Sequence, residues 1–334
     1  MRRPSLKDVA REAQVSYQTV SRVLKGEGRY ADATKERVRE TAARLGYLPN
    51  SAARALVTRR TRLIGVIADG SPRYGPVSTL VAVQAAARDA DYETLIATVY
   101  NPSQEEAQTI VDDFLRHGVE GIIVVAPRVP TAQISRLGKL PVPAVILAPG
   151  EINREGFTVF SEDQELGARL ATEHLIGLGH RRIMHLAGSQ EWLDGQVRLR
   201  GWRAALDAAS LSALPVRYGD WTGVSAYVIG QALVESGALP DAVFVASDLM
   251  ALAFIRALYE AGVRVPDDIS IVGFDDNEFA DQMFPPLTTV RQSFDLVGRR
   301  CMEILLGLIK GEEVDTTPAT PQLIVRSSTA LRTV

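Results

Sequence analysis

Apolar positions recur along the chain with two different periods, and the period changes near residue 62. Before that point, apolar residues lie three and four positions apart, as on one face of an amphipathic helix. After it, short continuous apolar runs alternate with longer amphipathic stretches. Such runs are typical of parallel strands covered by helices on both faces. We therefore expect an α/β protein preceded by a small helical segment.

Capping residues delimit the helices of that first segment. Ser5 and Asp8 have the spacing of a capping box, which marks a helix start. Ser16 is a second N-cap, and it opens a helix over residues 17–24. A third helix is predicted from about Thr34 to Leu45, with Gly46 as its end.

The second helix has two contrasting faces. Val20, Val23 and Leu24 make one face apolar. Side chains that can hydrogen-bond to base edges project from the other face: Tyr17, Gln18, Ser21 and Arg22. A recognition helix presents such side chains to the major groove from its first turns. Any three-helix bundle has the same apolar spacing, so the polar face is what favours a helix-turn-helix.

The charge of the chain is divided unevenly. The net charge is −3, but residues 1–62 hold 15 Lys and Arg against 6 Asp and Glu. The remaining residues hold 22 against 34. A basic segment on an acidic body suits contacts with DNA phosphates, which supply most nonspecific affinity.

Residues 50–62 combine a short helical pattern with a basic, polar stretch. The pattern is shorter than the ~12–15 residues that a helix needs to persist alone in water. We expect it to fold only against a partner helix and DNA. Leu56 is an apolar side chain there with no local core, and an ordinary linker is the alternative interpretation.

The apolar runs of the core fall into two successive sets. The first set includes residues 63–67, 94–97, 121–125 and 144–147, and the second includes residues 182–186, 242–245 and 269–274. We expect two doubly wound subdomains that follow one another in sequence. A ligand cleft is expected between them, at the carboxyl ends of the strands.

Several motifs are similar to those of the lac/galactose repressor family. They are residues 6–10, 15–23 and 45–50 in the first segment, and residues 178–183, 247–251, 273–276 and 286–290 in the core. The resemblance spans essentially the whole chain. It implies a helix-turn-helix headpiece over residues 1–49, a hinge over 50–62, and a periplasmic-binding-protein-like core of two subdomains over 63–334.

The resemblance also implies DNA-binding roles. Tyr17, Gln18 and Arg22 correspond to base-reading residues, and Leu56 to a wedge in the minor groove. Phosphate contacts are implied for Ser16, Thr19, Ser21 and Asn50. Gln14 stands where the family has a turn glycine and Ala31 where it has a capping serine, so Asp32 is expected to cap instead.

In the core, the resemblance implies an effector-binding cleft. Its expected polar contacts are Arg198, Ser247, Asp275 and Gln292, and its expected aromatic ones are Phe160 and Trp221, with Phe294 nearby. Ala148 replaces a family aspartate, while Asp69 and Arg73 add charge and Asp194 lies four residues before Arg198. The effector is therefore expected to be a sugar, not necessarily a galactoside, and a charged sugar is one option.

Other function classes lack supporting patterns. Cys301 is the only cysteine and there are four histidines, so we expect no disulfide and no structural metal site. No apolar run reaches the ~18–20 residues of a membrane span. The N-terminus does not resemble a secretory signal, and a cytoplasmic protein is expected. The sequence contains no recognisable catalytic or cofactor-binding motif, so neither an enzyme nor a cofactor is predicted.

Together with these patterns, the resemblance implies a repressor of carbohydrate-utilisation genes. It would bind a palindromic operator as a homodimer and be released by sugar. The chain carries no heptad-bearing tail after its last predicted strand, which favours a dimer over a tetramer. A solute-binding protein of a transporter is one alternative, but it would not carry the headpiece. A regulator that responds to a partner protein or a phosphorylated metabolite is the other.

Overall fold

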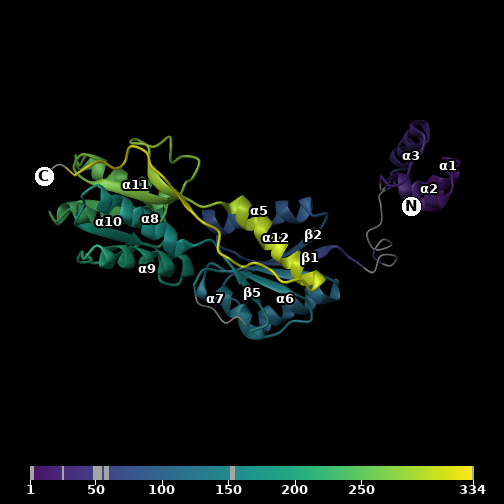
Figure 1. Cartoon of the computed structure of the whole chain (residues 1–334), viewed down its shortest axis with the longest axis horizontal. Coiled ribbons are helices and arrows are strands. Elements are labelled where there is room, and N and C mark those ends of the chain that lie inside the picture. Colours follow the sequence, from purple (N-terminus) through teal and green to yellow (C-terminus); the bar gives the residue numbers. More distant parts are fainter. Residues whose placement is uncertain (1–3, 25, 48–54, 56–59, 151–154, 333–334) are drawn as a thin grey trace. The chain divides into compact units, whose positions relative to one another are not determined.

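The protein is described here from a computed structural model covering residues 4–24, 26–47, 55, 60–150 and 155–332. These residues form two compact units that divide between Thr61 and Arg62. The first unit holds the three N-terminal helices, and the second holds every strand of the described chain (Figure 1). The expected hinge lies largely outside the described residues.

The three helices of the first unit are α1 (Leu6–Glu12), α2 (Tyr17–Leu24) and α3 (Asp32–Leu45). The predicted capping box is confirmed, since the Ser5 amide donates to Asp8 Oδ2 at 2.9 Å and Ser5 Oγ accepts from the Asp8 amide. Ser16 caps α2, with its Oγ accepting from the Thr19 amide at 3.0 Å.

The start of α3 differs from the prediction. It begins at Asp32, two residues early, and its N-cap Ala31 makes no side-chain hydrogen bond. Asp32 does not cap, because it lies inside the first turn and accepts from Lys35 Nζ at 2.9 Å. Gly46 ends the helix in the left-handed region, as predicted. Gln14 also adopts a positive φ of 52°, in the turn where the lac/galactose repressor family has a glycine.

Apolar faces of the three helices enclose a small core. Its fully buried members include Val9 of α1, Ala13 at the end of α1, Val20 of α2 and Val38 of α3. Arg37 of α3 closes the base of the bundle by donating from Nε to the Ala13 carbonyl at 3.1 Å. The spacing of the apolar residues thus determines which face of α2 is buried and which face is exposed to solvent.

The second unit contains two sheets. The first has the order β2-β1-β3-β4-β5 and is wholly parallel. Its strands are β1 (Leu63–Asp69), β2 (Glu93–Val99), β3 (Gly121–Val125), β4 (Ala144–Leu147) and β5 (Thr158–Phe160). Helices α5 (Tyr74–Asp89) and α12 (Phe294–Lys310) pack on one face, whereas α6 (Gln104–Arg116) packs on the other. The short α7 (Val129–Ala132) and a 3-10 turn (Gln133–Leu137) precede β4.

The second sheet has the order β11-β10-β9-β8-β6-β7, with only β11 antiparallel. Its strands are β6 (Ile183–Ala187), β7 (Arg217–Tyr218), β8 (Ala242–Val245), β9 (Ser270–Asp275), β10 (Thr288–Arg291) and β11 (Gln322–Ile324). Helices α8 (Gln164–Gly177) and α9 (Leu193–Ala208) cover one face, and α10 (Gly223–Glu235) and α11 (Asp248–Glu260) cover the other.

The two subdomains are not consecutive in sequence, which corrects the prediction. Helix α12 follows β10 of the second sheet but returns to the first, where Met302 and Leu305 share a core with Ile64. Gly298 permits this approach, because a Cβ there would lie 2.6 Å from the Ala82 backbone of α5. An amphipathic pattern shows that one face of a helix is buried, but it does not show which of the two sheets that face packs against.

Three segments therefore cross between the subdomains, and Figure 1 shows α12 lying beside α5, far from α11. They follow β5, β10 and α12 respectively. The crossovers meet near Ala319, whose amide donates to the Ser161 carbonyl at 3.0 Å and whose carbonyl accepts from the Asp163 amide at 2.8 Å. None of the helices in the described ranges has the length and apolar character of a membrane span.

Candidate functional site

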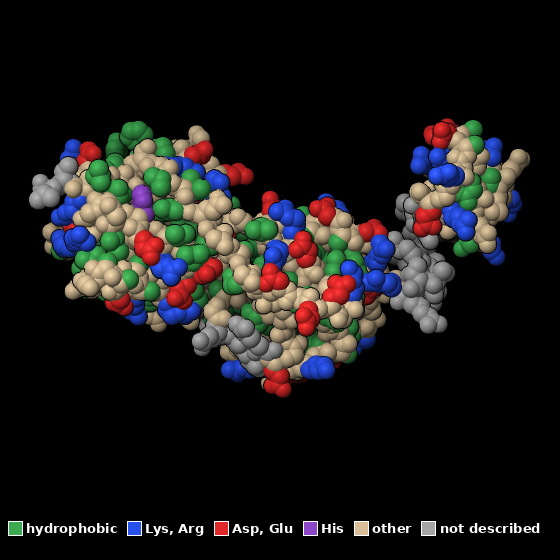
Figure 2. Space-filling model, viewed as in Figure 1, with side chains coloured by type: hydrophobic (Ala, Val, Ile, Leu, Met, Phe, Trp, Pro, Cys, Tyr) green, Lys and Arg blue, Asp and Glu red, His purple; other side chains and the backbone are tan. Residues whose placement is uncertain are grey.

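The solvent-facing side of α2 carries the predicted base-reading residues. Tyr17 is 50% exposed, and Gln18 and Arg22 are exposed as well. Ser16 and Thr19 are hydrogen-bonded to each other, with 2.8 Å between their hydroxyl oxygens. Ser21 is half-buried. Figure 2 shows several Lys and Arg side chains on the visible face of this unit, with a few Asp and Glu side chains among them. Asn50 and Leu56 lie outside the described residues, so their DNA contacts stay predictions.

A cleft between the two subdomains of the second unit is the candidate effector site. It has two lobes that meet between the subdomains. The lobes share Gly75, Pro76, Asp194 and Arg198. We call one the polar lobe, lined in part by Glu162, Gln164 and Gln292, and the other the aromatic lobe, lined in part by Tyr74, Trp192, Trp221 and Phe279.

Arg198 lies where the two lobes meet and lines both of them. Helix α9 positions its side chain, which is only 3% exposed. Its Nε donates to Gln164 Oε1 at 2.9 Å, and its Nη1 donates to the Ala246 carbonyl. The guanidinium also lies 3.7 Å from the ring centre of Phe274. A planar group held in this way presents a fixed edge to a ligand.

Asp275 faces Arg198 at the end of β9. Its Oδ1 lies 3.8 Å from Arg198 Nη2 and accepts from Gln292 Nε2 at 2.6 Å. Burial raises the pKa of Asp275 to about 6, although the Arg198 charge lowers it in part. Burial likewise raises the pKa of Asp194 to about 6, again against Arg198. Burial thus favours the neutral form of both carboxyl groups, whereas the Arg198 charge favours their charged, accepting form.

Two residues that line the cleft have an unusual backbone conformation. Asp275 has φ 113° and Trp221 has φ 70°, values that side-chain-bearing residues rarely adopt. Asp248 anchors the loop after β9 by accepting from the Asn277 amide at 2.7 Å. Such strain persists only where the surroundings hold it, and it is typical of functional sites.

Aromatic rings form the wall of the second lobe. The centres of the Trp192 and Trp221 rings are 5.5 Å apart, and Trp221 lies under the Arg198 guanidinium at 5.7 Å. Trp221 Nε1 is buried and has no hydrogen-bond partner among the described residues. Tyr74 meets Phe294 of the polar lobe edge-to-face at 5.5 Å. Rings of this kind suit the apolar faces of a sugar.

Two further predicted contacts line the aromatic lobe. Arg73 caps α5 at the rim, and its Nη2 donates to the Asp220 carbonyl at 3.3 Å. Ser247 is the N-cap of α11, and its Oγ accepts from the Met250 amide at 3.4 Å. The cleft therefore brings together Arg73, Arg198, Trp221, Ser247, Asp275 and Gln292. Their contacts with an effector stay predictions.

Asp69 is not among the residues that line the cleft, which corrects its expected position. It is the last residue of β1, and its Oδ2 accepts from Arg128 Nε and Thr131 Oγ1, both at 2.7 Å. Its Oδ1 accepts from the Ser71 amide. Asp69 thus forms a buried ion pair that fixes the loop after β3. The counter-charge lies 59 residues away in sequence, so no local pattern indicated it.

Phe160 is also displaced from its expected position. Its side chain is 1% exposed and packs in the core beneath α12. It does not line either lobe of the cleft. The aromatic contact on the polar lobe comes instead from Phe294 at the start of α12.

Sequence reasoning missed two side chains of the polar lobe, Glu162 and Gln164. Gln164 joins the network by donating from Nε2 to Gln292 Oε1 at 2.7 Å while accepting from Arg198. Both residues come directly after β5, at the carboxyl end of a parallel strand. Ligands of parallel α/β sheets bind at the carboxyl ends of the strands, so this position could have identified both residues as cleft residues. No group of three or more His, Cys, Asp or Glu side chains in the described ranges is arranged to hold a metal ion.

The helix-turn-helix unit and the cleft-bearing core define a class: transcription regulators whose DNA binding is joined to a ligand-binding core. Comparison with family models agrees. Residues 5–50 match the model of bacterial regulatory proteins of the lacI family, and residues 172–329 match a periplasmic binding protein-like domain. The chain belongs to the lacI family of bacterial regulatory proteins, and it is a DNA-binding transcription regulator.

Named relatives cover nearly the whole chain. The lactose operon repressor of Escherichia coli (strain K12) is 33% identical over 332 residues, covering 99% of this chain and 92% of the repressor. A crystal structure of the Lac repressor dimer bound to operator and the anti-inducer ONPF has a TM-score of 0.84, with 32% identity over 98% of this chain and 100% of that one. A complex of the transcriptional regulator CelR with cellobiose has a TM-score of 0.69, with 33% identity and the same coverage. These relatives are transcription regulators, not enzymes.

Proposed function

We propose that this protein is a transcriptional repressor of carbohydrate-utilisation genes that a sugar releases from a palindromic operator. The arrangement that carries the proposal is the Arg198 network at the junction of the two lobes. It combines a fixed cationic fork, two carboxyl groups and a pair of tryptophans within one cleft. Sugars need hydroxyl partners on their edges and aromatic surface on their faces, and the cleft offers both.

The free face of α2 supports the DNA-binding half of the proposal. Tyr17, Gln18 and Arg22 project from a helix whose other face is buried. Glutamine and arginine make bidentate pairs with adenine and guanine edges in the major groove. Operator binding by the related Lac repressor dimer supports the same role here.

An exposed apolar strip on α5 supports homodimer formation. Tyr74, Val77 and Val81 are 41%, 46% and 59% exposed, and they follow one another at helical spacing. Leu249 and Leu252 of α11 are likewise exposed. Apolar side chains grouped in this way are typical of surfaces that a second copy covers. A dimer would place two headpieces on the two half-sites of a palindrome.

For sugar to release the protein, it must bind the DNA-bound arrangement more weakly than the free one. The test is fluorescence anisotropy with a labelled operator, titrated with neutral sugars, sugar acids and sugar phosphates. We expect at least one sugar to lower operator affinity tenfold or more, and Arg198→Lys to weaken binding of that sugar. No response to any sugar would favour control by a partner protein. A response to sugar phosphates alone would favour the phosphorylated-metabolite alternative.

A further inference from the structure

Glu162 is a buried carboxyl group in the polar lobe that the arrangement described so far leaves without a role. It is 5% exposed and lies two residues after β5. Its Oε1 accepts from the Ser293 amide at 3.0 Å. Its Oε2 is buried and has no hydrogen-bond partner among the described residues. A buried polar atom left unpaired costs about 1–3 kcal/mol, more when it is charged.

The position of Glu162 points to the cleft as the source of the missing partner. Its side chain lines the polar lobe together with Gln164, Gln292 and Arg198. The charged groups that act on it are Arg198 and Asp194 of α9 and Asp275 of β9. Burial, together with the two aspartates, raises the pKa of Glu162 to about 7 despite Arg198 and the Ser293 amide.

The backbone around Glu162 holds this side chain in place. Glu162 pairs with Ala319 as an isolated bridge, and its carboxylate accepts from Ser293. It therefore touches all three crossover segments at once. A side chain fixed by two other segments keeps its free oxygen in one orientation, which is the condition for a selective contact.

We propose that Glu162 is an effector-binding residue whose Oε2 accepts a hydroxyl hydrogen from a neutral sugar. This inference rests on the proposed function. It also sets the chemical class of the effector. Three carboxyl groups, Glu162, Asp194 and Asp275, line the cleft. Two guanidinium groups, Arg198 and Arg73, also line it; Arg198 already donates to Gln164 and the Ala246 carbonyl and lies 3.8 Å from Asp275. Carboxyl groups thus outnumber guanidinium groups among the lining residues by three to two. An anionic sugar meets more repulsion there than a neutral one, so we expect uronates and sugar phosphates to bind more weakly.

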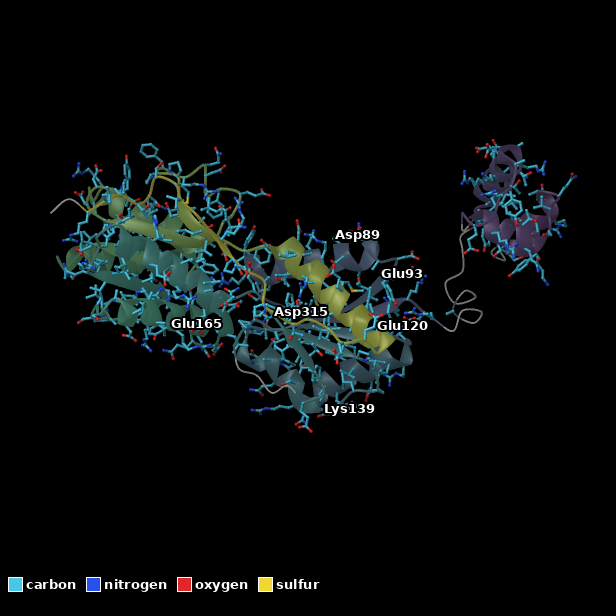
Figure 3. All side chains as sticks on the ribbon, in the orientation of Figure 1. Asp89, Glu93, Glu120, Lys139, Glu165 and Asp315 are labelled. Carbon is cyan, nitrogen blue, oxygen red and sulfur yellow. The ribbon has the colours of Figure 1, made fainter. Side chains whose placement is uncertain are left out.

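The test compares Glu162→Gln with the whole wild-type chain by titration calorimetry at pH 8. The probes are glucose, galactose, lactose and cellobiose, with glucuronate, galacturonate and glucose 6-phosphate as the anionic set. The matched control is Glu165→Gln. Glu165 lies three residues further on, is labelled in Figure 3, and pairs with Arg200 at 3.3 Å outside both lobes.

We expect Glu162→Gln to weaken binding of the best neutral sugar at least tenfold. Its preference for that sugar over the matching uronate should also fall at least tenfold. The amide replaces an acceptor with a donor and removes one negative charge. Glu165→Gln should stay within twofold of the wild type for every probe.

A second measurement needs no variant. At pH 7, a hydroxyl donated to Oε2 favours the charged form of Glu162, so sugar binding should release protons. Calorimetry in two buffers of different ionisation enthalpy measures this release, and we expect it to vanish in Glu162→Gln. Binding of a neutral sugar with equal affinity by the wild type and Glu162→Gln would overturn the inference and leave the proposed function standing. Binding of none of the sugars would overturn both.

Discussion

At the scale of single residues, the buried charged side chains of the core depend on partners that are distant in sequence. Arg198 is held by Gln164, 34 residues before it, and Asp69 by Arg128, 59 residues after it. The resemblance placed Arg198 and Asp275 in the cleft, where the structure has them. It could not show that the Asp69 carboxylate is already paired with Arg128. That pairing becomes visible only when β1 and β3 are known to be neighbouring strands. The α2 face was predictable, since helical periodicity alone separates Gln18 from Val20.

Gln18→Ala tests base reading by α2. Removal of one direct contact should cost roughly 1–3 kcal/mol on the preferred operator and relax the preference at one base position. Affinities for a set of single-base operator variants measure both effects. Arg11→Ala is the control, because Arg11 is an exposed cation on α1 that pairs with Asp8. Weakening of equal size on every operator variant would mean that Gln18 contacts only phosphate.

Glu162→Gln also changes the pH dependence of stability. The Glu162 pKa is about 7 in the fold and near 4.5 when unfolded, so the folded state retains a proton that the unfolded state loses. The contribution of Glu162 to stability therefore falls as pH rises from about 4.5 to about 7. Relative to the wild type, Glu162→Gln should gain roughly 3 kcal/mol between pH 4 and pH 8. Denaturant unfolding at both pH values measures this. A wild-type and variant difference that does not change with pH would contradict it.

At the scale of elements, start and stop signals were readable wherever they are local. The capping box of α1, the Ser16 cap of α2 and the Gly46 end of α3 depend on neighbouring residues, and each was predicted. The destination of α12 was not, because its apolar face fits either sheet. Its contact with α5 becomes visible only in the fold, through the close approach at Gly298.

Gly188→Ala tests how the aromatic lobe is built. A Cβ at Gly188 would lie 2.1 Å from the Trp221 ring, so the ring must move. We expect a stability loss of about 1–3 kcal/mol and weaker sugar binding, measured by denaturant unfolding and calorimetry. Gly177→Ala is the control, because a Cβ there has open space. Unchanged sugar affinity in folded Gly188→Ala would show that Trp221 does not contact the effector.

Gln14→Gly tests the cost of the unusual turn in the headpiece. Gln14 has φ 52°, a conformation that glycine adopts without strain. Relief of that strain exceeds the entropy that glycine adds to the unfolded chain, so the headpiece should gain up to about 1 kcal/mol. Hydrogen exchange of the Val20 and Val23 amides in the full chain measures local opening. Faster exchange in Gln14→Gly would contradict the expectation.

At the scale of the whole molecule, the sequence predicted the class of the protein, and the family match confirms it. The prediction that the two subdomains follow one another in sequence was wrong, because three crossover segments join them. If the cleft closes, the two subdomains must therefore move relative to each other about these three adjacent segments. This provides the physical route by which a ligand held by both subdomains favours one arrangement of the core.

Val81→Glu tests the proposed dimer surface. Val81 is 59% exposed and is the last residue of the α5 strip, and a buried unpaired charge there would oppose association. We expect sedimentation to show monomers at concentrations where the wild type is dimeric, with operator affinity reduced at least tenfold. Val325→Glu is the control, since Val325 is equally exposed but lies just after β11, away from α5. A dimeric Val81→Glu would place the interface elsewhere.

The most direct test of the account is selection of DNA from a random pool by the full-length protein, with and without candidate sugars. The account predicts enrichment of one palindromic sequence, and loss of that enrichment when a neutral sugar that binds the cleft is present. Enrichment that no sugar changes, or the absence of any enriched palindrome, would contradict it.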